Sequence, residues 1–158
     1  IYNHSLGFGE MYLNKVNVEK TIRTLEVSNY VSKVSATPEV RRKLVAIQKE
    51  IGKNKAVVMD GRDIGTVVFT DAELKIFMTS SAETRAQRRF DELIQKGEKV
   101  SYKEVYTNVV ERDRVDTTRK DSPLVKAEGA IEIDNSELSK EKQFEIILKL
   151  VEEKLRDI

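Results

Sequence analysis

Three short runs of the chain are rich in apolar residues, and they constrain the fold more than any other feature. The runs cover residues 56–59, 74–78 and 130–134, and helical patterns separate them. A strand that is covered on both faces has this kind of sequence, and parallel strands need a long crossover between them, usually a helix. The alternation therefore predicts an α/β fold with a parallel core sheet flanked by helices.

Five helices are expected from apolar residues at helical spacing and from start and stop signals. They cover residues 21 to about 33, 37–52, 80–97, 101–119, and about 139 to the C-terminus. Thr37 and Pro38 are typical of a helix start, and Gly52 and Gly97 are typical stops. Capping boxes are expected in the segment 80–83 and at residues 101 and 104.

The opening of the chain does not look like the start of a parallel sheet. Its first twenty residues alternate loosely between apolar and polar side chains, which predicts a small hairpin or two short strands. An open parallel sheet normally begins with a buried strand that leads into a helix. No stretch matches the phosphate-loop pattern GxxxxGK[ST]. We therefore expect a fold that lacks its first strand, its phosphate loop and its first helix.

Composition narrows the classes of function. Charged residues make up 35% of the 158 residues, yet the net charge is +1, so the overall charge gives no reason to expect nucleic acid or a membrane surface as partner. The chain has no cysteine, which excludes a disulfide framework, a thiol nucleophile and a cysteine zinc site. No run approaches the roughly 18 apolar residues of a membrane span. We expect one soluble domain in the cytoplasm.

Asp60, Gly61, Arg62 and Asp63 directly follow the first apolar run. Ligands of open α/β sheets bind beyond the carboxyl ends of the strands, so this is where a site is expected. Two carboxylates and a guanidinium group can hold a metal-bound phosphate, a base edge, or each other. On the residues alone, a binding site and an Asp-Gly turn with a local ion pair are equally good interpretations.

Arg112, Asp116 and Arg119 lie at offsets of four and seven residues, so they share one face of the fourth expected helix. Arginines placed in this way can grip an anion. Charge alone favours the simpler interpretation, which is an exposed helix with intrahelical ion pairs.

A further set of candidates precedes that helix. Arg85, Arg88 and Arg89 cluster on the third expected helix, and Ser32 and Arg41 flank the break at Thr37 and Pro38. Each group has a surface role as its simplest interpretation. Several arginine clusters in a chain of nearly balanced charge nevertheless indicate local anion binding, and phosphate is the obvious anion.

These candidates belong to a longer series of short motifs. The motifs are Ile22-Arg23-Thr24, Glu26-Val27-Ser28, the run DGRDIGTVVF at 60–69, Lys75-Ile76-Phe77, Glu111-Arg112-Asp113 and Ser122-Pro123-Leu124. In this order they resemble the bacterial cytidylate kinase family, and the run at 60–69 is the most specific of them. The resemblance covers nearly the whole chain, and only the first ten residues match poorly.

The resemblance implies the fold of P-loop nucleoside monophosphate kinases, with a parallel core sheet, a monophosphate-binding insert and a mobile lid. Residues 1–52 would form the insert and the helices that follow it. Residues 53–158 would form the remainder of the core domain, with the lid at about 85–119. The implied reaction transfers the γ-phosphoryl group of ATP to CMP or dCMP and gives CDP or dCDP. Because the phosphate loop is missing, we expect these 158 residues alone to be inactive as a kinase.

The resemblance also implies how the monophosphate would be bound. Ser32, Arg41 and Asp63 would recognise the cytosine edge, with Asp63 accepting a hydrogen bond from the exocyclic amine. The phosphate and the sugar would be bound by residues from two segments, with Arg62 and Arg119 on the phosphate and Arg112 and Asp116 on the sugar.

The implied cofactors are ATP and Mg²⁺. Arg85, Arg88 and Arg89 would lie at the lid and contact the phosphates of ATP. Catalysis would rest on Arg62, Arg88 and Arg119, because phosphoryl transfer demands positioned cations around the transferred group. No metal ligand is assigned, and Asp60 is the one nearby carboxylate to consider. The implied enzyme is a monomer that binds neither nucleic acid nor a membrane.

Two other functions remain open. Another P-loop kinase of a small metabolite would share the sheet and the arginines but would lack a cytosine pocket. A non-catalytic module that binds anions or RNA belongs to a different class. It is disfavoured because stacking aromatic residues do not interleave with the basic residues.

Overall fold

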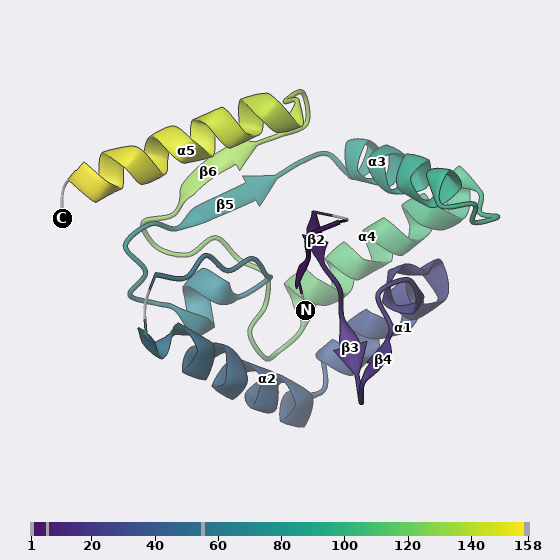
Figure 1. Cartoon of the computed structure of the whole chain (residues 1–158), viewed down its shortest axis with the longest axis horizontal. Coiled ribbons are helices and arrows are strands. Elements are labelled where there is room, and N and C mark those ends of the chain that lie inside the picture. The colour runs from purple at the N-terminus through teal and green to yellow at the C-terminus, as the bar shows by residue number, and fades with distance from the viewer. Residues whose placement is uncertain (1, 6, 55, 157–158) are drawn as a thin grey trace.

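The computed structural model describes residues 2–5, 7–54 and 56–156, apart from the side chains of Tyr2, Asn3, Phe8 and Ser32. The α-helices within this part of the chain are α1 (Leu25–Ser35), α2 (Pro38–Ile51), α3 (Ala82–Gln95), α4 (Tyr102–Thr118) and α5 (Lys140–Arg156). Figure 1 shows α5 beside the central sheet, α2 on the opposite side of the molecule, and α3 and α4 on a third side.

The central sheet consists of two parallel strands in the described residues, β5 (Ile76–Thr79) and β6 (Ile131–Asp134). Ile76 lies opposite Ile131, and Thr79 lies opposite Asp134. The chain between the strands contains α3 and α4, which form the helical crossover that parallel pairing requires. The expected α/β class with a parallel sheet is confirmed.

The first of the three predicted strands is wrong. Residues 56–60 have no strand assignment, Ala56 has a φ of 50°, and the side chain of Val58 is fully exposed. A strand exists only where a neighbour completes its hydrogen-bond ladder, and β5 pairs with β6 rather than with this segment. The run is apolar, but among the described residues no neighbouring strand pairs with it.

The N-terminal segment forms two antiparallel hairpins, where the loose alternation predicted one small hairpin or two short strands. The strands β1 (Tyr2–Asn3) and β2 (Phe8–Gly9) pair with each other, and β3 (Tyr12–Leu13) pairs with β4 (Val16–Asn17). Asn14 and Lys15 connect the second pair, and their φ values of 49° and 69° fit the tight turn that a two-residue hairpin loop requires.

Most helix starts and stops agree with the sequence. The helix α2 begins at Pro38 and ends before Gly52, although Thr37 in the N-cap position makes no side-chain cap bond. The predicted capping box at the start of α4 is confirmed. Ser101 Oγ accepts a hydrogen bond from the Glu104 amide, and the Glu104 carboxylate accepts one from the Ser101 amide at 2.8 Å.

Two other helix starts differ from the prediction. The first predicted helix is divided into a 3₁₀ turn, η1 (Thr21–Arg23), and α1. The capping box in the segment 80–83 does not form, because α3 begins one residue later than expected. Ser81 is the N-cap and its Oγ accepts a hydrogen bond from the Thr84 amide at 3.1 Å, so Glu83 stands one position too early to close a box.

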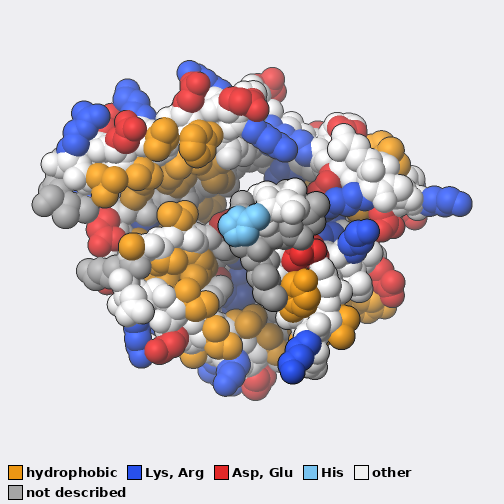
Figure 2. All heavy atoms as spheres, in the orientation of Figure 1, with side chains coloured by type: hydrophobic (Ala, Val, Ile, Leu, Met, Phe, Trp, Pro, Cys, Tyr) orange, Lys and Arg blue, Asp and Glu red, His pale blue; other side chains and the backbone are white. Residues whose placement is uncertain are grey.

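The buried apolar residues of the described chain come from four elements, η3 (Ile64–Val68), α3, α4 and β6. They are Val68, Ala86, Leu93, Val105 and Ile133. Large apolar side chains are exposed on α2, in the segment 57–58 and on α5, where Phe144 and Leu155 are 64% and 66% exposed. Figure 2 shows apolar side chains gathered over the side of the molecule where these elements lie. The helix α5 therefore presents much of its apolar face to solvent.

Replacing Ser101 with alanine should lower the free energy of unfolding by about 1 kcal/mol, because the first turn of α4 loses its side-chain cap. The measurement is urea unfolding of the 158-residue chain at neutral pH. Lys103→Ala is the matched control, since Lys103 is exposed in the same turn and should change the free energy by less than roughly 0.5 kcal/mol. Equal effects of the two substitutions would contradict the capping role.

Candidate active site

Six of the predicted site residues line one hollow of about 150 Å³. These residues are Arg41, Arg62, Asp63, Arg112, Asp116 and Arg119. They come from α2, from the loop that precedes a short π-helix, and from α4 with the residue that ends it. Segments that lie up to 78 positions apart, from 41 to 119, therefore meet at one place. The structure brings the substrate-binding candidates together, except that the side chain of Ser32 on α1 lies outside the described residues.

Arg41 and Asp63 form a buried ion pair at one side of the hollow. A second nitrogen of Arg41, Nη1, donates to the backbone carbonyl of Ser35 at 3.2 Å. The guanidinium group is thus held between α1 and the loop. A buried charge is tolerated only where it is paired, so each member of this pair holds the other in place.

Asp116 anchors the arginines at the other side. Its carboxylate accepts hydrogen bonds from Arg62 Nε at 2.8 Å and from Arg119 Nη1 at 2.9 Å, and Arg112 Nε lies 3.8 Å from it. The Asp116 side chain is 3% exposed, whereas the Arg62 and Arg112 side chains are 42% and 38% exposed. One buried carboxylate therefore holds Arg62 and Arg112, which are still open to solvent, together with the buried Arg119.

The hollow has an excess of positive charge. Its lining contains four arginines and two aspartates, which leaves two positive charges unbalanced. Burial and the nearby Arg62 lower the pKa of Arg112, and burial and the nearby Arg41 lower the pKa of Arg119. These guanidinium groups crowd one another, so an anion between them would relieve the repulsion.

Three buried guanidinium nitrogens in the hollow have no hydrogen-bond partner among the described residues. They are Arg41 Nε, Arg112 Nε and Arg119 Nη2. A buried donor without an acceptor costs free energy, and such groups in a native protein commonly face a missing ligand, ion or water. Together with the two unbalanced charges, they favour an oxygen-rich dianion, and a phosphate monoester fits that description.

A π-helix, η3 (Ile64–Val68), positions Asp63 at the edge of the hollow. Its wider turn is set by a bond from the Phe69 amide to the Ile64 carbonyl at 2.7 Å, and Thr66 Oγ1 donates to the Asp63 carbonyl. Gly61 permits the close approach of this turn, because a Cβ there would lie 2.9 Å from Ile64 Cγ1. The sequence contained no signal for a π-helix, and such turns often occur at functional sites.

The arginines of α3 do not line this hollow. All the nitrogens of the Arg85 side chain are engaged, with Asp113 of α4 at 2.7 and 2.6 Å and with the Ser80 carbonyl at 3.1 Å, and the bonds to Asp113 raise the pKa of Arg85. Arg88 donates to the Asn135 carbonyl at 2.7 Å. Arg89 pairs with Glu92 and with a backbone carbonyl of η1. These residues hold α3 against three other segments.

The described part of the chain shows no metal site. No group of three or more His, Cys, Asp or Glu side chains is placed to hold a metal ion there. Asp60 is exposed and does not line the hollow.

Several residues of the hollow were not predicted from the sequence. They are Val31, Ser35, Leu44, Val45, Gln48 and Gly61. Leu44 and Gln48 stand three and seven positions after Arg41 on α2, so the same helical spacing that groups the arginines of α4 would have found them. Leu44 is 48% exposed and contributes to the wall of the hollow.

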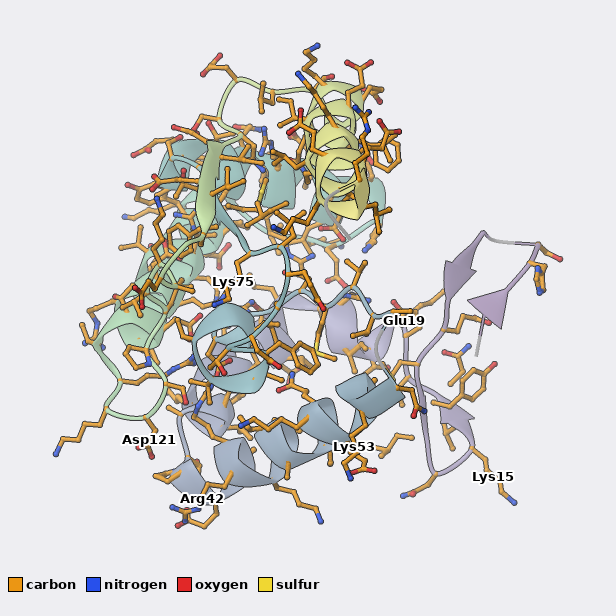
Figure 3. All side chains as sticks on the ribbon, turned by 90° about the vertical axis from the view of Figure 1, so that its left-hand side faces the viewer. Lys15, Glu19, Arg42, Lys53, Lys75 and Asp121 are labelled. Carbon is orange, nitrogen blue, oxygen red and sulfur yellow. The ribbon has the colours of Figure 1, made fainter. Side chains whose placement is uncertain are left out.

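A larger hollow of about 380 Å³ lies along another part of the α2 surface and shares Arg41 and Val45 with the first. Arg42 and Asp121 are among its lining residues, and Figure 3 shows both where the loop after α4 approaches one end of α2, with Lys53 near the other end. Among the described residues that line this larger hollow, Arg41 is the one arginine with a buried partner. It is also the one with a buried nitrogen that lacks a hydrogen-bond partner. The smaller hollow is therefore the candidate active site.

The sequence model of the cytidylate kinase family matches residues 2–153. The chain belongs to the cytidylate kinase family. Cytidylate kinases of Flavobacterium johnsoniae and Flavobacterium psychrophilum are 71% and 67% identical to it over 150 residues, which is 95% of the chain. The cytidylate kinase of Cytophaga hutchinsonii is 44% identical over all 158 residues.

The chain spans 65% and 66% of the lengths of the two Flavobacterium cytidylate kinases. The family match confirms the resemblance that the motifs indicated, and it includes every candidate residue of the hollow. Among the described residues, no helix has the length and apolar character needed to cross a membrane.

Proposed function

We propose that the protein containing these residues transfers the γ-phosphoryl group of ATP to CMP or dCMP. The observation that carries the proposal is the hollow itself, in which four arginines face two buried aspartates and three buried guanidinium nitrogens lack a partner. A nucleoside monophosphate brings two negative charges and several acceptor oxygens to such a place. Membership of the cytidylate kinase family supports cytosine as the base.

We assign the phosphate to Arg62 and Arg119 and the sugar to the side of Arg112 and Asp116. The phosphate assignment is supported by the common anchor of the two arginines, since Asp116 fixes both at 2.8 and 2.9 Å. Cations that are fixed before the substrate arrives need no reorganisation when charge spreads over the transferred group. Arg62 and Arg119 are accordingly our candidates for stabilising the transition state.

The cytosine edge is assigned to Asp63 and Arg41, with Ser32 as a third candidate from α1. One oxygen of Asp63 is engaged by Arg41, so the other remains for the exocyclic amine of the base. A carboxylate has acceptor oxygens only, so uracil, which presents a carbonyl oxygen in place of the amine, would be repelled.

ATP with Mg²⁺ is the proposed phosphoryl donor, and Arg85, Arg88 and Arg89 are proposed to contact its phosphates. In the structure as described they bind other segments, so those bonds would have to exchange for bonds to the phosphates. The described residues do not assemble a magnesium site. We further propose a cytoplasmic monomer that does not bind nucleic acid.

CMP should stabilise the 158-residue chain, whereas AMP should not. At a CMP concentration near 100 times Kd, binding adds about 2.7 kcal/mol, which corresponds to a rise in Tm of roughly 5 to 10 °C for a domain of this size. Differential scanning calorimetry with CMP, dCMP, UMP, AMP and shikimate measures the preference. Equal shifts with CMP and AMP would contradict a cytosine site, and a shift with inorganic phosphate as large as the shift with CMP would reduce the hollow to a general anion site.

A further inference from the structure

Gln48 lines the active-site hollow and has no part in the roles assigned above. It lies on α2 seven residues after Arg41, so two helical turns place it on the same face of the helix as the arginine that pairs with Asp63. The side chain is half-buried. Its position therefore makes it a wall of the site rather than an ordinary solvated residue of α2.

The carboxamide of Gln48 makes no hydrogen bond to any residue that the structure describes. An amide group has two N–H donors and an oxygen acceptor, and polar groups that are partly removed from water normally find partners. Its neighbours in the wall include Leu44 and Val45, which cannot supply any from their side chains. The carboxamide is thus available to a molecule in the hollow.

The lining residues differ in chemistry from one element to another. Arg62 and Arg119 are cationic and suit the phosphate, and Arg112 stands on α4 before Arg119. The α1 and α2 residues of the lining include Val31 and Leu44, whose apolar side chains suit the faces of a planar ring. Gln48 belongs to this second group, together with Arg41.

Resting on the proposed function, we infer that Gln48 is a further specificity-determining residue, which hydrogen-bonds the edge of a pyrimidine base. A carboxamide presents either its N–H or its oxygen after a rotation of the terminal group. It can therefore pair with the amine of cytosine or with the carbonyl of uracil at similar free energy. Gln48 strengthens the binding of pyrimidine nucleotides in general, and Asp63 distinguishes cytosine from uracil.

The test compares the binding of CMP, UMP and ribose 5-phosphate to the 158-residue chain by isothermal titration calorimetry. Ribose 5-phosphate has the sugar and the phosphate but no base. Gln48→Leu keeps the approximate size of the side chain and removes the amide, so it should weaken CMP and UMP by about three- to tenfold each, as expected for one neutral hydrogen bond. The affinity for ribose 5-phosphate should not change.

Two further variants separate a contact with the base from a change of shape. Gln48→Glu keeps the shape but leaves only acceptor oxygens, so it should raise the CMP to UMP affinity ratio. Gln95→Leu is the matched control, because Gln95 is exposed at the end of α3 and does not line the hollow. Its affinities for all three ligands should equal those of the unsubstituted chain.

The outcomes distinguish this inference from the proposed function. If the unsubstituted chain bound ribose 5-phosphate as tightly as CMP, the hollow would make no favourable contact with a base. Both the proposed function and the role of Gln48 would then be wrong. If the chain preferred CMP but Gln48→Leu retained the full preference, only the inference would be overturned. A loss of all three ligands in Gln48→Leu would also overturn it, because the residue would then shape the hollow and not contact the base.

Discussion

Asp116→Ala should destabilise the chain by about 3 to 5 kcal/mol, which is the usual effect of removing one partner from a buried charge cluster. The carboxylate is 3% exposed and binds Arg62 and Arg119, and the Arg119 side chain is itself 5% exposed. Without Asp116, a guanidinium group stays buried with no counter-charge, and the hollow carries one more unbalanced positive charge. Urea unfolding measures the loss of free energy.

Inorganic phosphate provides a second measurement on the same variant. A dianion would replace part of the missing negative charge, so phosphate should stabilise Asp116→Ala more than it stabilises the unsubstituted chain. Asp121→Ala is the control, since Asp121 is an exposed residue in the loop that follows α4. A loss below about 1 kcal/mol for Asp116→Ala, similar to a surface substitution, would mean that the carboxylate does not hold the arginines together.

Asp63→Ala should weaken CMP binding by about ten- to a hundredfold, because one charge-assisted hydrogen bond to the cytosine amine contributes roughly 1.5 to 3 kcal/mol. The affinity for UMP should fall much less, so the ratio of the CMP affinity to the UMP affinity should decrease. Because Asp63 also pairs with the buried Arg41, Asp63→Asn serves as a better-folded variant. Its amide can donate to the uracil carbonyl, and UMP should then bind about as well as CMP.

The contrasting variant is Arg119→Ala. A contact with the phosphate is common to both nucleotides, so this substitution should lower the affinity for CMP and UMP together and leave their ratio unchanged. Calorimetric titrations of each variant with both nucleotides give the four affinities. Our roles for the two residues would be wrong if Asp63→Ala kept the ratio and Arg119→Ala altered it.

The sequence predicted the arginine face of α4 because helical spacing is a local property. Offsets of four and seven residues place Arg112, Asp116 and Arg119 together wherever that helix lies. The ion pair of Arg41 with Asp63 could not be predicted from spacing, since the two residues belong to separate elements. Their expected proximity came from the resemblance to the family, because spacing carries no information about how two elements pack.

The wrong strand at 56–59 and the missed Gln48 have related physical causes. An apolar run indicates that a segment can be buried, but a strand also needs a neighbour with free backbone groups, and local sequence does not reveal whether one is there. On an amphipathic helix, the spacing of apolar and polar residues predicts that a polar residue faces solvent. Gln48 has that pattern, yet it faces a hollow whose other walls come from α1, α4 and the loop at 61–63.

The arginines of α3 show a third limit. Their clustering was visible in the sequence, but apart from Glu92 and the Ser80 carbonyl their partners are Asp113, the turn after β6 and a carbonyl of η1, which lie between 28 and 66 residues away along the chain. Ion pairs with distant segments are fixed only after the helices have packed. Whether these residues also contact ATP stays a prediction.

The helix α4 carries two contacts that must move together if the helix moves as a rigid body. Arg112 reaches the active-site hollow, and the next residue, Asp113, grips Arg85 of α3 through two hydrogen bonds. Consecutive residues on an α-helix point about 100° apart, so one helix addresses two neighbours at once. Any roll of α4 that draws Arg112 toward a bound sugar swings Asp113 by the same angle. A rotation of α4 that displaced Arg112 would therefore also displace the partner of Arg85 on α3.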